Sequence, residues 1–284
     1  MRMDHQGPAG GRGTPELFDL TGRRAIVTGG AGLLGRRFAA ALVDLGAEVR
    51  LLDRDADAAA KAAGELTGPG QAAAVACDIT DEADVDRAVS AVAAGGAIDV
   101  LVNSAAVDPK ADAATSTLAD AGFADYPLAA WRRSMDVNLT GTFLVTRAVC
   151  RVMEAQGAAG RGAIVNISST YGLAGPDQRL YQRSDGTRSF KPLDYSVTKA
   201  GMLGLTRALA AHYAGTEIRV NALTPGGAFN EHDDEFVAAY SSRTILGRMA
   251  QPDEYRGAIA FLCSDASSYM TGANLIVDGG WTAW

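Results

Sequence analysis

The sequence predicts an α/β fold in which helices cover both faces of a parallel β-sheet. Short apolar runs, which predict buried strands, alternate along the chain with segments of helical periodicity. A glycine-rich turn joins the first of these strands to a helical segment, and polar residues directly follow several of the strands. At 284 residues and 48% hydrophobic content, the chain can bury the core of one large domain or of two small ones.

The composition argues against several classes of partner. Nucleic acids and anionic membranes both require a basic protein face, whereas the formal net charge is −7. No apolar run approaches the length of a membrane span, and the chain starts without a signal-peptide core. Cys77, Cys150 and Cys263 lie in apolar surroundings without the spacing of metal ligands, so we expect buried thiols and no metal site. Together these features predict a soluble cytoplasmic protein.

The N-terminal residues 1–16 are rich in glycine and lack periodicity, which predicts a disordered tail before a folded region of residues 17–284. Residues 25–28 then predict a buried strand, and a helical pattern follows residue 35. The glycines between them let the backbone turn tightly and approach a pyrophosphate at the helix N-terminus. An ordinary glycine-rich turn is the alternative interpretation. The residues that we expect to hold a dinucleotide here are Gly29, Gly30, Gly32, Leu33, Leu34 and Gly35.

The next predicted strand, residues 48–52, ends at Asp53. A carboxylate about 20 residues beyond the glycines can accept hydrogen bonds from the ribose hydroxyls of adenosine and repel a 2′-phosphate. The sequence therefore predicts NAD as the cofactor in preference to NADP. Arg54 argues against this preference, because a guanidinium at that position can bind a phosphate. The other interpretation of Arg54 is a solvated surface charge.

Two further predicted strands end in polar residues. Residues 73–77 lead to Asp78, and residues 98–102 lead to Asn103. Parallel sheets of this kind bind ligands at their carboxyl edge, so these positions predict contacts with adenine and ribose, although turn or cap residues follow the same pattern. The expected cofactor contacts at these two strand ends are Asp78, Ile79, Asn103, Ser104 and Ala105.

The second half of the chain carries the residues that predict chemistry. Tyr195 and Lys199 are four positions apart and so share one face of a helix. A neighbouring ammonium favours the phenolate and moves a tyrosine pKa toward neutrality, where a general acid/base works best; a solvated helix face is the alternative for such a pair alone. Ser169 follows a predicted buried strand at residues 163–167. Asn138 lies within a largely apolar predicted helix, where its amide must be hydrogen-bonded.

In this order and spacing, the motifs resemble those of the short-chain dehydrogenase/reductase family. The residues that carry the resemblance are Thr28-Gly29-x-x-Gly32-x-x-Gly35, Asp53, Asp78, Asn103, Asn138, Ser169, Tyr195-x-x-x-Lys199, Pro225-Gly226 and Val277-Asp278-Gly279-Gly280. The resemblance runs from about residue 17 to the C-terminus and implies a single Rossmann-type domain with a parallel sheet of about seven strands. It also implies further cofactor contacts at Pro225, Gly226 and Ala228, and a homodimer or homotetramer.

The resemblance further implies a catalytic tetrad of Asn138, Ser169, Tyr195 and Lys199. Tyr195 would exchange a proton with the carbinol or carbonyl oxygen of the substrate while Ser169 hydrogen-bonds that oxygen. Lys199 would hold the nicotinamide ribose and lower the pKa of Tyr195, and Asn138 would anchor a water that connects Lys199 to solvent. The hydride would pass directly between the nicotinamide and the substrate carbon.

One departure from the family pattern concerns the glycine-rich turn. The common pattern has its second glycine at the position of Leu33, whereas this chain has Gly32. That spacing occurs in the extended branch of the family, which includes sugar-nucleotide epimerases and dehydratases, but this chain is too short for the substrate domain of that branch. We therefore expect a local change, and an epimerase or dehydratase that retains its NAD is the first alternative.

The largest departure is the stretch between Ser169 and Tyr195, which is about twice as long as the family usually has. We interpret residues 172–194 as an active-site insertion like that of bacterial oxidoreductases of carbohydrate biosynthesis. It contains three arginines and one lysine, which in an acidic protein suggests a polyhydroxylated or anionic substrate. A solvated loop or a subunit contact is the alternative. The expected substrate contacts are Tyr171, Gln178, Arg179, Tyr181 and Phe229.

Three further segments are expected to lie around the substrate or at the surface. Residues 108–130 predict a loop with a short helix, and residues 226–245 predict a substrate lid with Gly227 as its hinge. His232 lies among acidic residues without a second histidine nearby, so we expect a solvated loop there in preference to a metal site. The aromatic tail at residues 281–284 is expected to be covered by another subunit.

The sequence therefore predicts an enzyme that transfers a hydride between NAD and a secondary alcohol or ketone. Its expected substrate is a polar small molecule, namely a sugar, a sugar derivative or a cyclitol. A non-catalytic protein that senses dinucleotides is the second alternative, and the complete tetrad argues against it. An enoyl reductase is disfavoured because that relative spaces its tyrosine and lysine farther apart.

Overall fold

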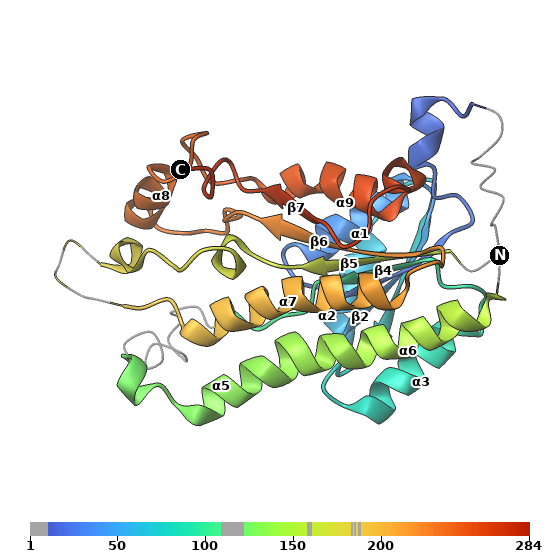
Figure 1. Ribbon diagram of the computed structural model, residues 1–284, viewed down its shortest axis with the longest axis horizontal. Coiled ribbons are helices and arrows are strands. Elements are labelled where there is room, and N and C mark those ends of the chain that lie inside the picture. Colours follow the sequence, from blue (N-terminus) through green and yellow to red (C-terminus); the bar gives the residue numbers. More distant parts are fainter. Residues whose placement is uncertain (1–10, 109–121, 158–160, 183, 185, 187–188) are drawn as a thin grey trace.

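A single parallel sheet of seven strands forms the centre of the molecule (Figure 1). The computed structural model describes residues 11–108, 122–157, 161–182, 184, 186 and 189–284. The strands are β1 (Arg24–Thr28), β2 (Glu48–Asp53), β3 (Gln71–Ala76), β4 (Val100–Asn103), β5 (Gly162–Ile167), β6 (Ile218–Pro225) and β7 (Asn274–Val277). Their spatial order is β3-β2-β1-β4-β5-β6-β7. This arrangement confirms the predicted α/β fold with a Rossmann-type parallel sheet of about seven strands.

Helices cover both faces of the sheet. The longer helices are α1 (Gly35–Asp44), α2 (Ala56–Glu65), α3 (Glu82–Ala93), α5 (Leu128–Ser134), α6 (Thr142–Ala155), α7 (Leu193–His212), α8 (Asp234–Ser241) and α9 (Arg256–Cys263). Shorter 3-10 turns are η1 (Thr14–Phe18), η2 (Phe123–Asp125), η5 (Thr170–Gly172), η6 (Gln178–Tyr181), η7 (Pro252–Tyr255) and η8 (Asp265–Ser267). Figure 1 shows α1 and α9 on one face of the sheet and α3, α6 and α7 on the other.

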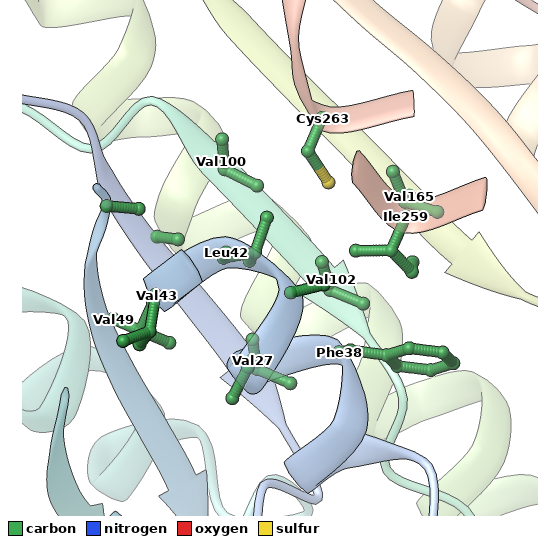
Figure 2. Packing of buried hydrophobic residues seen from close by; sticks show 14 of the residues in the cluster. Val27, Phe38, Leu42, Val43, Val49, Val100, Val102, Val165, Ile259 and Cys263 are labelled. Atoms are coloured by element: carbon green, nitrogen blue, oxygen red, sulfur yellow. The ribbon is translucent and has the colours of Figure 1, made fainter. Parts of the chain in front are cut away.

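The strands are apolar on both faces because each face is buried beneath a helical layer. In β1, Ala25 and Val27 belong to the core that α1 and α9 cover, whereas Ile26 belongs to the core that α3 and α6 cover. This alternation follows from the two-residue period of a strand. Figure 2 shows the first core, in which Phe38 and Leu42 of α1 point toward the valines of the sheet. Burial of each such side chain contributes about 1.5–3 kcal/mol to stability.

Some of the predicted boundaries differ from the observed ones. Residues 1–10 of the predicted tail lie outside the described residues. Within the rest of the predicted tail, Arg12 forms a 2.8 Å ion pair with Asp265 and the 3-10 turn η1 begins at Thr14. The helix predicted around Asn138 is interrupted by a π-helical segment, η3 (Met135–Gly141). Of the predicted loop at 108–130, residues 109–121 lie outside the described residues. The three cysteines are buried free thiols, as predicted.

The strand order creates a topological switch point between β1 and β4. The chain proceeds from β1 to the neighbouring β2 on one side, and from β4 to the neighbouring β5 on the other. The loops that leave the carboxyl ends of these two strands therefore diverge and open a crevice, which is where ligands bind in sheets of this kind. Within the described part of the chain, no helix combines the length and apolar character needed to cross a membrane.

Candidate active site

A cavity of about 930 Å³ lies at the carboxyl ends of the strands. Its lining includes the glycine-rich turn, the ends of β2 and β3, and residues of the 226–245 segment. Ser169, Tyr195 and Lys199 line the same cavity. The predicted dinucleotide turn and the predicted chemical groups therefore share one space.

Three glycines of the turn, Gly29, Gly30 and Gly35, pack too closely against their surroundings to be replaced by residues with a Cβ. Gly29 has a φ of +63°, and a Cβ there would lie 2.7 Å from the Cα of Ala105 in the loop after β4. A Cβ on Gly30 would lie 2.6 Å from the Cβ of Leu51, and one on Gly35 would overlap the carbonyl of Gly29. A Cβ on Gly32 would meet only that same carbonyl oxygen, at 3.1 Å. The turn is thus held tightly against β2 and β4.

The turn also leaves a helix N-terminus open toward the cavity. No side chain caps α1 at Leu34, whereas Asp55 caps α2 and Asp81 caps α3. Leu33 and Leu34 line the cavity together with Gly29, Gly32 and Gly35. Because free N–H groups and the helix dipole favour an anion, this cradle fits the diphosphate of a dinucleotide.

The ends of β2 and β3 supply carboxylates to the cavity. Asp53 Oδ2 accepts a 3.1 Å hydrogen bond from the backbone N–H of Ala31, so the carboxylate is fixed beside the glycine turn. Asp78 accepts hydrogen bonds from the hydroxyl and the N–H of Thr80, and these lower its pKa, with a smaller contribution from the positive charge of Arg54. Both carboxylates and Arg54 line the cavity.

Asn103 does not place its side chain in the cavity. Its Nδ2 donates to Thr146 Oγ1 at 2.9 Å and to Asn166 Oδ1 at 2.8 Å, and its Oδ1 is buried without a hydrogen-bond partner. The cavity is lined there by Ser104 and Ala105, whose backbone N–H groups donate to Thr28 Oγ1. The residues that line the cavity at the end of β4 are therefore Ser104 and Ala105, and not the side chain of Asn103. Ile79 lines the cavity as expected from the sequence.

The first turns of α7 carry Tyr195 and Lys199 on the side that faces the cavity. Asp194 fixes the start of this helix, because its buried carboxylate accepts hydrogen bonds from Ser134 Oγ and from the N–H of Tyr195. Lys199 Nζ donates to the carbonyl of Ile167 at 2.9 Å, at the end of β5. Ser169 Oγ accepts a hydrogen bond from the N–H of Tyr171.

Burial dominates the pKa values of both Tyr195 and Lys199. Burial raises the pKa of Tyr195 above its ordinary value, the negative charge of Asp108 raises it further, and a hydrogen bond with Ser169 acts in the opposite direction. Burial also lowers the pKa of Lys199 to about 8, which weakens the ammonium as a source of positive charge. These directions describe the protein alone, so the lowering of the Tyr195 pKa by Lys199 together with oxidised nicotinamide, which the resemblance implies, stays a prediction.

The side chain of Asn138 hydrogen-bonds backbone groups beside the cavity. It is fully buried, its Oδ1 accepts from the N–H of Val107 at 2.8 Å, and its Nδ2 donates to Val107 O and Thr198 Oγ1. These bonds tie the loop after β4 to α7. The side chain that was expected to anchor a water is therefore already engaged with protein groups. Its position in the π-helical η3 is typical of functional regions.

Two of the five expected substrate contacts line the cavity. Tyr171 and Tyr181 do so, and their hydroxyls are 3.2 Å apart. Arg179 instead forms an ion pair with Asp177 while 70% of its side chain is exposed. Gln178 hydrogen-bonds the backbone of Lys191, and Phe229 contacts His232, so neither contributes to the lining.

Several lining residues were missed by the sequence analysis or assigned another environment. They are Asp108, Lys191, His232, Phe236, Tyr240 and Met249. His232 lies in the loop before α8, where it is half-buried, lines the cavity and stacks on Phe236 at 5.0 Å. Phe236 and Tyr240 are four positions apart on α8, and this helical spacing was a signal that could have identified them.

Contacts within the 226–245 segment, and the stacking of Tyr240 on Trp281 of the C-terminal tail, hold this segment in place. The lid role of the segment stays a prediction. Gly227 donates a 2.5 Å hydrogen bond to the hydroxyl of Tyr240, and a Cβ on Gly227 would collide with the Tyr240 ring. This packing explains the glycine without a hinge. Pro225, Gly226 and Ala228 line the cavity at the base of the segment.

The C-terminal tryptophans have different surroundings. Trp281 stacks on Tyr240 at 4.4 Å and contacts Tyr171 edge-on, so its own chain covers part of it. Trp284 is 75% exposed.

A parallel sheet with a dinucleotide-type turn at its switch point, next to a paired tyrosine and lysine, defines a nicotinamide-dependent oxidoreductase. A family model described as enoyl-(acyl carrier protein) reductase matches residues 30–282. The chain is 36% identical over 273 residues to a D-threitol dehydrogenase of Mycolicibacterium smegmatis, covering 93% of this chain and 95% of that protein. It is 39% identical over 272 residues to a cis-4-hydroxycyclohexanecarboxylate dehydrogenase of Sinomonas cyclohexanicum, covering 92% and 97%.

A solved structure extends the similarity to the fold. The crystal structure of a gluconate 5-dehydrogenase from Burkholderia cenocepacia, in complex with NADP and tartrate, is similar with a TM-score of 0.81 and 31% identity, covering 96% of this chain and 100% of that one. This chain belongs to the short-chain dehydrogenase/reductase family. The expected family and the expected enzyme class, an oxidoreductase of CH–OH groups, are thereby confirmed.

Proposed function

We propose that the protein is an NAD-dependent dehydrogenase of a secondary alcohol in a polyol, a sugar derivative or a cyclitol. The observation that carries this proposal is the single cavity in which Asp53 and the open N-terminus of α1 occur together with Ser169, Tyr195 and Lys199. The similarity to a D-threitol dehydrogenase supports a polyol substrate.

The cofactor preference rests on Asp53. Its carboxylate is held beside the glycine turn by the N–H of Ala31, where it can accept hydrogen bonds from the hydroxyls of an adenosine ribose. A 2′-phosphate at the same place would meet this negative charge. Arg54 also lines the cavity and is the group that could offset the repulsion, and the similar gluconate 5-dehydrogenase was crystallised with NADP.

The residues of this chain would position the substrate and move its proton. Bound nicotinamide supplies the hydride chemistry of this enzyme class. Ser169 Oγ would hold the substrate oxygen, and Tyr195 would exchange a proton with it. The pKa of Tyr195, which burial raises, favours the protonated form, which can donate to a carbonyl oxygen in the reduction direction. In the oxidation direction the phenolate must accept the proton, and the positive charges of Lys199 and of oxidised nicotinamide would favour that form. Lys199 is fixed beneath it by the Ile167 carbonyl, where it can reach a ribose hydroxyl.

The test is the near-ultraviolet absorbance of reduced nicotinamide, measured with NAD and NADP in parallel across polyols, sugars, sugar acids, cyclitols and simple alcohols. Tyr195→Phe serves as the blank, because it removes the proton donor and leaves the cavity shape. NAD-linked oxidation of a polyol that is lost in the variant is the expected result. Turnover with NADP alone would overturn the cofactor preference. NAD that stays bound through gel filtration without net turnover would favour an epimerase or dehydratase.

We also propose a cytoplasmic homodimer or homotetramer. Large apolar side chains remain exposed near the last strand of the sheet, notably Tyr269, Ile276 and Leu246, and such side chains favour association. The three buried free thiols suit a reducing compartment. Light scattering during gel filtration measures the assembly, and a mass equal to the 29.4 kDa chain would contradict it.

A further inference from the structure

The segment before α7 brings a charged pair into the cavity beside Tyr195. Lys191 Nζ forms an ion pair with the carboxylate of Asp108, and both residues line the cavity. The ammonium lies over the ring of Tyr195, 4.2 Å from its centroid, which is closer than the 5.7 Å of Lys199 Nζ. The side chain of Lys191 is only 11% exposed. The pair is therefore a part of the reaction space and not of the outer surface.

Lys191 is held in this position at both of its ends. Its backbone N–H donates to Gln178 Oε1 at 2.9 Å, and its carbonyl accepts from Gln178 Nε2 at 3.4 Å. At the other end, the ammonium contacts Asp108 and the faces of Tyr195 and Tyr171. Cation–π contacts of this kind favour a fixed position for a partly desolvated ammonium. The arrangement is a preformed site for a polar group.

Most of the remaining wall on this side of the cavity is aromatic. It includes Tyr171, Tyr181, Phe236, Tyr240 and Met249, together with the polar side chains of Asn230 and His232. Arg132, Arg133 and Asp136 also line the cavity, but they are exposed at its rim, where water and salt screen their charges. A substrate near Tyr195 thus meets carbon-rich ring faces and the Lys191–Asp108 pair. In ligand pockets, a small number of polar groups in a mainly apolar wall usually fixes the orientation of the ligand and gives the site its specificity.

We propose that Lys191 and Asp108 bind a second hydroxyl group of a neutral diol or polyol, next to the carbinol that Ser169 and Tyr195 hold. This inference rests on the proposed function. A hydroxyl can donate its proton to the carboxylate of Asp108 and accept from the ammonium of Lys191 at the same time, which satisfies both charged groups. A carboxylate substituent would gain Lys191 but would face the negative charge of Asp108.

The pair therefore decides between the two substrate classes that the basic segment suggested. Of the described cations in that segment, Lys191 enters the cavity paired with Asp108, and Arg179 is exposed and paired with Asp177. Arg183 and Arg188 lie outside the described residues. The subsite carries no net charge. It selects polyhydroxylated substrates and disfavours anionic ones.

The experiment compares three matched substrates in the presence of the preferred cofactor. They are cyclohexanol, cyclohexane-1,2-diol as its cis and trans diastereomers, and 2-hydroxycyclohexanecarboxylate, so that only the neighbouring substituent changes. We expect kcat/KM for the better diol to exceed that for cyclohexanol by about 10- to 100-fold, the usual worth of hydrogen bonds to charged groups. We expect the carboxylate to be the poorest of the three.

Substitutions of Lys191 and Asp108 test whether this pair causes the preference for the diol. Lys191→Met and Asp108→Asn should each lower the ratio of diol to cyclohexanol by about tenfold or more. Asp108→Asn should in addition raise the relative kcat/KM of the carboxylate, because the repelling charge is gone. Arg179→Gln is the matched control, since it removes an outward-facing cation of the same segment and should leave both ratios unchanged.

The outcomes separate this inference from the function on which it rests. If no alcohol, including cyclohexanol, is oxidised with either cofactor, the proposed function fails. If cyclohexanol is oxidised as well as the diol, or if the ratio survives Lys191→Met, only the subsite is wrong. A preference for the carboxylate would overturn the selection by charge. Calorimetric binding of the same three ligands to the protein loaded with NADH gives the ratios independently of turnover and also covers a variant with impaired chemistry.

Discussion

The cofactor side and the substrate side of the cavity are built in different ways. On the cofactor side, the turn after β1 and the ends of β2 and β3 follow one another within a short stretch of chain. Backbone N–H groups and tightly packed glycines form most of this side. On the substrate side, Tyr171, Lys191, Tyr240 and Trp281 meet from segments far apart in the sequence. The first side is specified by local motifs, and the second by which side chains the fold brings together.

The largest expected effect lies where the two sides meet. Tyr195→Phe removes the hydroxyl that exchanges the proton, so kcat should fall by about 10²- to 10⁴-fold, the usual contribution of a general acid/base. Binding of NADH should persist, because the contacts of the cofactor side are untouched. Steady-state kinetics and NADH fluorescence titration measure the two quantities. Full activity in the variant would contradict the assignment of Tyr195.

The cofactor side can be tested by one charge. Asp53→Asn keeps the size of the side chain but removes the negative charge near the adenosine ribose, so the ratio of kcat/KM for NADP to that for NAD should rise about 10- to 100-fold. Asp57→Asn, an exposed position in the first turn of α2, is the matched control. An unchanged ratio in Asp53→Asn would show that another group, with Arg54 as the first candidate, sets the preference.

A pair of glycines tests how tightly the substrate side is attached to α7. A Cβ on Gly172 would lie 2.7 Å from the carbonyl group of Lys199 and from Ser168 Oγ, whereas a Cβ on Gly175 has nothing within 4 Å. Gly172→Ala should therefore lower the free energy of unfolding by about 1–3 kcal/mol, as overpacking usually does. Gly175→Ala should change it little. Urea unfolding followed by circular dichroism measures both, and equal effects would refute the close packing.

The smallest expected effect is a pH dependence of stability. Burial lowers the pKa of Lys199 to about 8 from an ordinary value of 10.5, so between these pH values the unfolded chain binds more protons than the folded one. The contribution of this group to the free energy of unfolding should therefore rise from pH 8 to pH 10, by at most about 1.4 kcal/mol per pH unit. Above the ordinary tyrosine pKa of 10, the raised pKa of Tyr195 acts with the opposite sign.

The variant Lys199→Met isolates the contribution of Lys199 to the pH dependence of stability. In Lys199→Met the titrating group is absent, so unfolding in urea should show a weaker rise between pH 8 and pH 10 than in the unchanged protein. Parallel curves for the two proteins would mean that Lys199 keeps its proton throughout this range.

The sequence predicted the strands well because their apolar runs need no knowledge of the partner strand. The predicted strand at residues 163–167 corresponds to β5 (Gly162–Ile167), and the predicted strand at 48–52 corresponds to β2 (Glu48–Asp53). Asn103 shows the limit of such reasoning. Its place at the end of β4 was clear from the sequence, but the direction of its side chain depends on Thr146 and Asn166, which hydrogen-bond it from α6 and β5.

The substrate side shows the same limit more strongly. Lys191 precedes Tyr195 by four positions, but it lies outside α7, so helical spacing could not place it over the Tyr195 ring. Asp108 comes from the loop after β4, and nothing in the sequence pairs it with Lys191. The aromatic contacts of Trp281 with Tyr240 and Tyr171 likewise join the C-terminal tail to two other segments.

The sequence by itself determined the α/β class, the glycine turn with Asp53 beyond it, and the Tyr195–Lys199 pair. These features rest on periodicity and short spacings, which local backbone geometry converts directly into structure. Only the tertiary structure decided the pKa values of Tyr195 and Lys199, the inward turn of Lys191 and the aromatic wall. Desolvation and long-range contacts set those properties, and both depend on which segments pack around a side chain.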